Sequence, residues 1–230
     1  MKHFIFLLTF FICLSSFSQT QRKVYLLDMT QTNSETNLSR YYAAENILDF
    51  IKVPYDKGSS INAITNYPVV ITGSRFKDNT LTPTEISTIQ NYVQNGGVLI
   101  SSSLRENDLF NLFGISSSTS ANDMFFIDFD NTTYPNLFQY INDTLETRIS
   151  LGKPSLVTNF YTKKYVATPS SIVLGRYEDN SPAFIKNNVG SGTTYLLGPD
   201  FRDITYRNFV NLDISLTDLI LMVLNLAQMY

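Results

Sequence analysis

Polar and charged side chains follow several predicted strands of this 230-residue chain, at the points where each apolar run ends. Ligands of open parallel sheets bind outside the carboxyl ends of the strands, so these side chains are the candidate site residues. We expect five segments to gather there: 28–30, 73–75, 101–103, 128–130 and 200–203. The candidate ligand-binding residues, whose hydroxyl and charged groups could hydrogen-bond a sugar, are Asp28, Ser74, Arg75, Ser102, Asp200 and Arg202.

The serine run at 101–103 could contain a nucleophile, which would need an adjacent base to activate it. The only cysteine, Cys13, and the only histidine, His3, both lie within the first 18 residues. The remaining bases are lysine and carboxylate, and an unperturbed carboxylate is too acidic to deprotonate serine well. A structural role explains the run more simply, because Ser103 with Glu106 three residues later forms a capping box that would begin a helix.

The aspartates at the strand ends carry the oxygen ligands that Ca²⁺ and Mg²⁺ prefer. The four candidates, Asp28, Asp128, Asp130 and Asp200, do not have the spacing of an EF-hand loop. Carboxylates in such positions also cap loops or pair with arginine. The glycines at 190–192 open no helix, so they indicate a hairpin turn and not a phosphate loop. The sequence therefore predicts no metal site and no cofactor.

Residues 1–18 have the features of a secretory signal peptide. A basic start precedes the apolar stretch 4–14, and Ser16 and Ser18 place small residues before an expected cleavage at Gln19. The stretch is too short to span a membrane, so we expect export to the periplasm or the extracellular space. Only 16% of the residues are charged, the net charge is −3 and no basic tract is visible, which argues against a nucleic-acid partner.

The elements that would position the candidate residues are clearest over 69–103. The apolar run 69–72 ends at a glycine and predicts a buried strand. Thr82 to Glu85 combine a hydroxyl cap, a proline at the first helical position and a glutamate three residues after the cap, which predicts a helix over 84–95. An Asn-Gly-Gly turn ends this helix, and a second apolar run at 98–101 follows. Strand, helix and strand in this order form a right-handed βαβ unit with parallel strands.

The same patterns predict the other elements. They are a strand at 24–28, a helix at 39–51, an extended edge piece at 53–55, a helical turn at 61–64, a helix at 104–113, a strand at 125–129, strands at 172–177, 182–186 and 193–197, and a closing helix over 214–227.

These elements predict a three-layer α/β fold, flavodoxin-like, with a mostly parallel sheet. Strands 24–28, 69–72 and 98–101 should be neighbours at its centre. Antiparallel strands within 172–197 should be added at one edge near the C-terminus, and helices 84–95 and 104–113 should cover the faces.

The order of these elements resembles the class I glutamine amidotransferase-like superfamily. The resemblance rests on the L-T-P-T-E-I helix start, the Asn-Gly-Gly turn and the ending V-L-G-R-Y…A-F-I-K…V-G-S-G-T-T-Y-L-L-G-P-D. That ending is similar to the close of the non-amidotransferase branches, which include ThuA-like proteins, the trimerisation domain of some β-galactosidases and domains attached to polysaccharide deacetylases. The resemblance covers Val24 to Tyr230, and it implies a single domain over 19–230 after the signal peptide at 1–18.

This sequence departs from the amidotransferases at their nucleophile. There, the strand corresponding to 98–100 leads into a G-x-C-x-G elbow, whereas positions 101–105 here read Ser-Ser-Ser-Leu-Arg. The resemblance thus implies the scaffold without its chemistry, because fold does not confer function. We expect an exported, non-catalytic binding or accessory module whose candidate partners are a glycan or a carbohydrate-active enzyme. The alternative is a carboxylate- or serine-dependent hydrolase acting on carbohydrate, which as a carboxylate enzyme would show two carboxylates with perturbed pKa values converging in one crevice.

Overall fold

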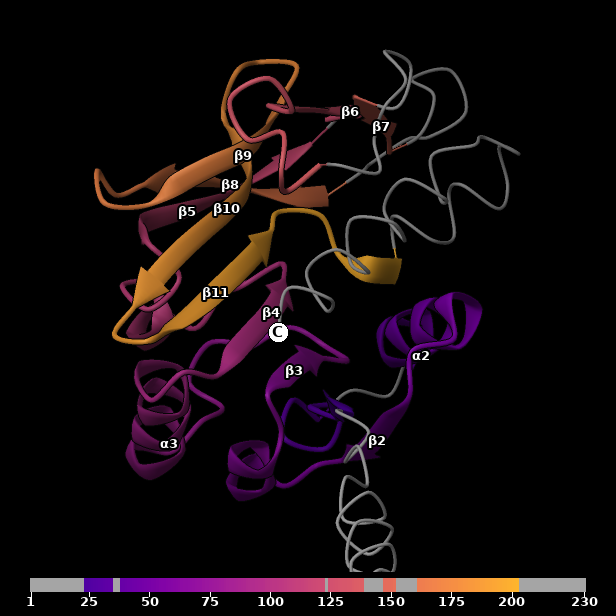
Figure 1. Cartoon of the computed structure of the whole chain (residues 1–230), viewed down its shortest axis with the longest axis vertical. Coiled ribbons are helices and arrows are strands. Elements are labelled where there is room, and N and C mark those ends of the chain that lie inside the picture. Colours follow the sequence, from indigo (N-terminus) through magenta and orange to yellow (C-terminus); the bar gives the residue numbers. More distant parts are fainter. Residues whose placement is uncertain (1–22, 35–37, 123, 139–146, 152–160, 203–230) are drawn as a thin grey trace, which may run out of the picture.

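The computed structural model describes residues 23–34, 38–122, 124–138, 147–151 and 161–202. They form a nine-stranded mixed sheet with helices on both faces, and a separate two-stranded sheet (Figure 1). No helix in these described ranges is long and apolar enough to cross a membrane. The predicted signal peptide at 1–18 and the predicted closing helix at 214–227 lie outside the described residues.

The parallel half of the large sheet confirms the predicted βαβ arrangement. Four of its strands are buried along their whole length, as expected for strands covered on both faces. Val69 pairs with Val24 on one side and with Val98 on the other, in parallel register. In spatial order the strands are β2 (Tyr55–Gly58), β1 (Val24–Leu27), β3 (Val69–Thr72), β4 (Val98–Ser102) and β11 (Gly192–Leu197).

The edge strand β2 begins later than predicted. The expected extended piece at 53–55 reaches the sheet only at Tyr55, because Pro54 has no N–H to donate. The Pro54 carbonyl instead accepts a hydrogen bond of 3.1 Å from the backbone N–H of Val24. The predicted turn at 61–64 is a 3₁₀ helix, η1 (Ile61–Asn66).

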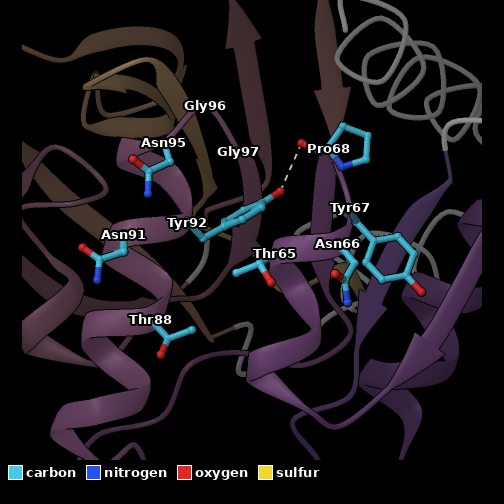
Figure 2. Close-up of a pocket in the computed structure, with 10 residues that line it drawn as sticks. All are labelled: Thr65, Asn66, Tyr67, Pro68, Thr88, Asn91, Tyr92, Asn95, Gly96 and Gly97. Carbon is cyan, nitrogen blue, oxygen red and sulfur yellow. Dashed lines mark hydrogen bonds between the residues drawn. The ribbon is translucent and has the colours of Figure 1, made fainter.

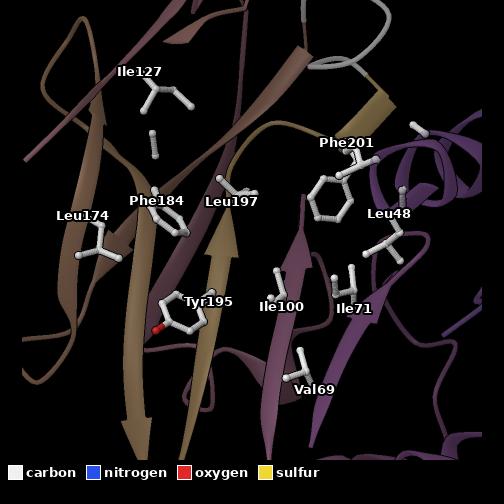
Figure 3. Close-up of a cluster of buried hydrophobic side chains, with 14 of the residues drawn as sticks. Leu48, Val69, Ile71, Ile100, Ile127, Leu174, Phe184, Tyr195, Leu197 and Phe201 are labelled. Carbon is white, nitrogen blue, oxygen red and sulfur yellow. The ribbon is translucent and has the colours of Figure 1, made fainter. Parts of the chain in front are cut away.

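Two α-helices cover opposite faces of the parallel strands (Figure 1). Helix α2 (Ser39–Ile51) packs on the face that carries Ile71 and Ile100, and Figure 3 shows Leu48 of this helix among them. Helix α3 (Pro83–Gln94) packs on the other face. Its N-terminus has the predicted capping box, in which the Thr82 hydroxyl accepts from the Glu85 N–H and the Glu85 carboxylate accepts from the Thr82 N–H.

The rest of the large sheet is antiparallel and contains the predicted hairpin. Strand β11 is parallel to β4 but antiparallel to its other neighbour, so the change of direction occurs there. Three antiparallel steps separate β11 from β6, and β6 therefore runs opposite to the parallel strands. Continuing from β11, the strands are β10 (Pro182–Val189), β9 (Ile172–Tyr177), β6 (Phe126–Phe129) and β7 (Arg148–Ser150).

The predicted helix at 104–113 is wrong. The segment contains only one 3₁₀ turn, η2 (Asn107–Leu109), followed by further turns. Ser103 adopts a left-handed conformation with φ of 49°, and the Glu106 carboxylate accepts hydrogen bonds from the backbone of Asn79 and of Asp108. Glu106 therefore does not complete a capping box with Ser103. The leucines of the segment and Phe113 are still buried, and Phe110 is partly buried, so the apolar pattern reflects burial without a helix.

The separate sheet was not predicted from the sequence. It pairs β5 (Ile115–Asn122) with β8 (Tyr161–Ala167) in antiparallel register. Both strands are dominated by serine, threonine, lysine or tyrosine and lack a clean apolar alternation. Lys163 of β8 donates its backbone N–H to the carbonyl of Gly198 at 3.3 Å, which places β8 beside the carboxyl end of β11.

Candidate functional site

A polar pocket of about 240 Å³ lies where β3, β4 and β11 end, at the carboxyl edge of the parallel strands. We call it the carboxyl-edge pocket. Its cationic lining residues are Arg40, Arg75, Arg105, Lys163 and Arg202. Its other lining residues are one carboxylate, Asp200, and three hydroxyls, Ser103, Ser120 and Thr162. Five cations therefore surround one carboxylate in a chain whose overall charge is negative.

The cations reach this pocket from five separate parts of the chain. Arg75 follows β3, Arg105 follows β4 and Arg202 follows β11, so parallel topology alone brings these three together. Arg40 comes from the first turn of α2, and Lys163 comes from β8 of the small sheet. The basic character of the site is a property of the fold, because no two of these residues are close in sequence.

Asp200 is held in a buried ion pair. Its side chain is only 5% exposed, and one carboxylate oxygen accepts a hydrogen bond from the Nε of Arg40. The other oxygen accepts from the backbone N–H of Arg202 at 3.0 Å. With both oxygens engaged, this carboxylate is poorly placed to act as a base or to bind a metal.

The surroundings of the pocket affect two of its cationic side chains. Burial lowers the pKa of Lys163, and the positive charges of Arg105 and Arg75 lower it further, against an opposing effect of Asp78. The Nε of Arg105 is buried and has no hydrogen-bond partner among the described residues. A bound anion could therefore accept hydrogen bonds from the pocket and neutralise part of its positive charge.

Three of the six residues predicted from the sequence line the pocket: Arg75, Asp200 and Arg202. Ser102 is buried at the end of β4, and its neighbour Ser103 takes the place in the lining. The structure therefore places Ser103, and not Ser102, in the lining of the pocket.

The other two predicted residues stabilise loops near the pocket without lining it. The Ser74 hydroxyl is buried and accepts a hydrogen bond of 2.9 Å from the side-chain amide of Asn33. An Asp28 oxygen accepts from the backbone N–H of Thr30 at 2.9 Å and closes the turn after β1. Both side chains therefore make local structural hydrogen bonds at the carboxyl edge.

The segment at 128–130 does not join the other four. The prediction requires 125–129 to be one more parallel strand, whereas β6 runs in the opposite direction and is separated from β11 by β10 and β9. Asp128 instead forms a bidentate, half-exposed ion pair with Arg148 of β7, at 2.6 and 2.8 Å.

Hydroxyl groups in the pocket lining are the candidate nucleophiles. Among the described residues, no hydrogen bond joins the hydroxyl of Ser103 to Lys163 or to Asp200, and the hydroxyl of Thr162 is paired with that of Tyr177 at 2.7 Å. The described part of the chain also has no group of three histidine, cysteine or acidic residues that could hold a metal ion. The five cations of the lining are suited to binding an anion.

A larger groove of about 570 Å³ lies at the opposite edge of the sheet, where β3 and β4 begin (Figure 2). We call it the amino-edge groove. It is lined by the end of η1 and the last turns of α3, and none of its lining residues is charged. Tyr92 lies at its floor, with its hydroxyl donating to the Pro68 carbonyl at 3.1 Å. The two edges of the parallel strands thus differ sharply in charge.

Comparison with known proteins gives a fold and not a sequence family. No protein-family model matches this sequence, and no curated protein matches it closely enough to indicate a relationship.

Solved structures do match. A β-galactosidase from Bacillus circulans sp. alkalophilus matches over 84% of this chain and 30% of its own, with a TM-score of 0.57 and 16% identity. The exo-β-1,4-mannosidase Op5Man5 from Opitutaceae bacterium strain TAV5 matches over 90% of this chain and 36% of its own, with a TM-score of 0.61 and 14% identity. A ThuA-like protein from Bacteroides uniformis ATCC 8492 matches over 91% of both chains, with a TM-score of 0.56 and 13% identity.

These matches agree with the resemblance found in the sequence. The chain has the class I glutamine amidotransferase-like fold, in the form seen as part of glycosidases and in ThuA-like proteins. It spans only about a third of the length of each of the two glycosidases.

Proposed function

We propose that this chain is a non-catalytic binding module, and that its carboxyl-edge pocket holds part of a carbohydrate ligand. The observation that carries the proposal is the state of Asp200, the one carboxylate among the described residues of the pocket lining. Arg40 and the N–H of Arg202 occupy both of its oxygens. A glycosidase that works through carboxylates needs two of them, one to protonate the leaving group and one to attack or activate water. This pocket offers neither in a usable form.

Two further observations support the accessory role. The amidotransferase scaffold normally uses a cysteine and a histidine, and residues 19–230 contain neither. Two of the similar structures are glycosidases in which the matching part is about a third of the chain. A carbohydrate-processing enzyme, or the glycan itself, is therefore the partner that we propose.

Export is part of the same proposal. The signal-like segment at 1–18 would direct the chain to the periplasm or the extracellular space, with cleavage before Gln19. Mass spectrometry of the protein recovered from the source cell would test this. We expect an N-terminus at Gln19, and a product that retains residues 1–18 would refute it.

Binding and turnover must be measured together. The mature protein, residues 19–230, would be titrated by calorimetry with a panel of oligosaccharides and then incubated with the same panel, with ester substrates and with glutamine. We expect saturable binding of an oligosaccharide and no conversion of any substrate. Turnover that disappears in Ser103→Ala or Asp200→Ala would overturn the proposal, because those residues would then belong to an active site.

A further inference from the structure

The charge of the carboxyl-edge pocket is opposite to that of the whole chain. The chain carries a net charge of −3, yet five cations and one carboxylate line a space of about 240 Å³. Like charges brought together in a partly buried site repel one another more strongly than they would in water. Arg40 is paired with Asp200, but the charges of Arg105 and Arg75 act against the charge of Lys163, and a bound anion would offset this repulsion.

The donors of the pocket are suited to an oxyanion. Arginine presents a planar fork of N–H groups that matches the two oxygens of a carboxylate or the face of a sulfate. Four of the five cations are arginines, and the buried Nε of Arg105 has no partner among the described residues. A bound oxyanion would supply that partner and would reduce the repulsion that Lys163 experiences from its neighbours.

The size of the pocket limits what enters it. Pockets that enclose a drug-sized ligand measure roughly 300–1,000 Å³, and this one is smaller. It can hold one charged group and part of the ring that carries it. The hydroxyls of Ser103 and Ser120 lie in the same lining and can hydrogen-bond the rest of that ring.

The arrangement of the cations in the carboxyl-edge pocket argues against a nucleic-acid ligand. Nucleic-acid sites need a stripe of cations that follows several phosphates. Here the cations converge on one small space, and the large groove at the opposite edge has no charged lining residue. A long polyanion would therefore find only one point of attachment on a protein of net negative charge.

We infer that the carboxyl-edge pocket selects an acidic saccharide, binding the carboxylate of a uronic acid or a sulfate ester through Arg105, Lys163 and the arginines around them. The inference rests on the proposed function and specifies which class of glycan that function concerns.

The test compares ligands of equal length that differ in charge. The mature protein would be titrated with an oligouronate, a sulfated oligosaccharide and a neutral oligosaccharide, and each titration would be repeated in the presence of inorganic sulfate. We expect one of the two acidic saccharides to bind at least tenfold more tightly than the neutral one, and inorganic sulfate to compete. Comparison of the two acidic saccharides identifies the source of the oxyanion.

Adjacent lysines provide a matched pair of variants. Lys163 lines the pocket, whereas Lys164 pairs with Asp179 outside it. Lys163→Gln and Arg105→Gln should each weaken acidic-saccharide binding about tenfold, which is the effect of losing one charge-assisted hydrogen bond. Lys164→Gln should change it by less than about twofold. Thermal melting would show whether each variant is folded, and Arg105→Lys, which keeps the charge but loses the fork, should fall between wild type and Arg105→Gln.

The outcomes separate the inference from the proposed function. A neutral oligosaccharide that binds as tightly as the acidic ones, with no effect of Lys163→Gln, would overturn the inference and leave the binding function intact. If no saccharide binds but inorganic sulfate does, in a manner that depends on Lys163, both the saccharide ligand and the proposed glycan function are wrong. Tighter binding of an oligonucleotide or a phosphopeptide than of either acidic saccharide would also overturn the inference.

Discussion

Arg40 and Asp200 form a largely buried ion pair across 160 residues of sequence. Arg40 lies in the first turn of α2, and Asp200 lies in the loop that follows β11. Their side chains are 18% and 5% exposed. The pair joins an early helix to the last described strand of the sheet, and it also fixes the acidic residue of the carboxyl-edge pocket.

Replacing Arg40 with methionine should destabilise the protein strongly. The variant leaves the Asp200 carboxylate buried without its cation, which costs on the order of 3 kcal/mol in comparable pairs. Urea denaturation at pH 7 would measure the change in the free energy of unfolding. The double variant Arg40→Met, Asp200→Asn should recover part of the loss, because neither member of the pair then carries a charge.

An exposed ion pair provides the control for this prediction. Lys23 and Asp56 are 3.0 Å apart, but their side chains are 44% and 42% exposed. Lys23→Met should change stability much less than Arg40→Met does, because solvent screens the exposed pair. Equal losses in Arg40→Met and Lys23→Met would mean that the burial of the first pair has no energetic consequence.

The helix cap at Thr82 should contribute measurably to stability. Its hydroxyl accepts the Glu85 N–H at 3.3 Å, and the Glu85 carboxylate accepts the Thr82 N–H at 2.8 Å. Thr82→Ala should cost about 1 kcal/mol in the free energy of unfolding, measured by urea denaturation. Ser87→Ala in the same helix is the control, because its hydroxyl bonds only the Pro83 carbonyl, four residues earlier, and its loss should be near neutral. A larger effect at Ser87 than at Thr82 would contradict the role of the cap.

Two capping patterns in this sequence show how far local signals can be trusted. Thr82 and Glu85 form the predicted box, because both partners lie at the surface and have no competing bonds. Ser103 and Glu106 have the same spacing and do not, because the Glu106 carboxylate is used by the backbone of Asn79. That competing contact depends on the loop after β3, and it cannot be inferred from a four-residue pattern.

Part of the pocket lining was predictable from the sequence. Arg75 follows a predicted parallel strand, and Asp200 and Arg202 follow the predicted strand 193–197, so all three were expected at the carboxyl ends of strands. Arg105 had the same signal, since it comes three residues after β4. Lys163 had none, because β8 lacks the alternation that predicts a strand. The excess of positive charge was therefore invisible in the sequence, where the cations are scattered.

Gly192, at the start of β11, should not tolerate a side chain. A Cβ at this position would lie 2.0 Å from the Val93 carbonyl oxygen and 2.4 Å from that of Gly97. Backbone atoms cannot move aside as a side chain can, so Gly192→Ala should cost on the order of 3 kcal/mol, at the upper end of overpacking effects. Thermal denaturation would measure the loss as a lower midpoint.

Gly58 offers a matched comparison in the same sheet. There, the nearest atom to an added Cβ is the hydroxyl of Tyr25 at 2.7 Å, at the far end of a side chain that can shift. Gly58→Ala should therefore lower the melting midpoint much less than Gly192→Ala. The reverse order would show that contacts with backbone do not govern these sites.

The contribution of Asp179 to stability should depend on pH. Burial alone would raise its pKa, but hydrogen bonds from Lys164 and Ser181 outweigh this and lower the pKa to about 2. The carboxyl group of an aspartate in an unfolded chain has a pKa of about 3.9. Because the folded value is the lower one, the stabilisation is fully present above about pH 5 and is lost as the pH falls toward about 2.

Asp179→Asn would reveal this dependence. The Asp179 side chain is 36% exposed, so solvent screening limits the effect, and the variant should be less stable than wild type by under about 1 kcal/mol at pH 7. The difference should shrink steadily in urea denaturation between about pH 5 and pH 3, as the wild-type carboxylate becomes protonated in the unfolded state. Lys164→Gln, which removes the main partner, should show a smaller loss with the same trend. A stability difference that stays constant down to pH 3, or that grows there, would mean that the ion pair does not set the ionisation of Asp179.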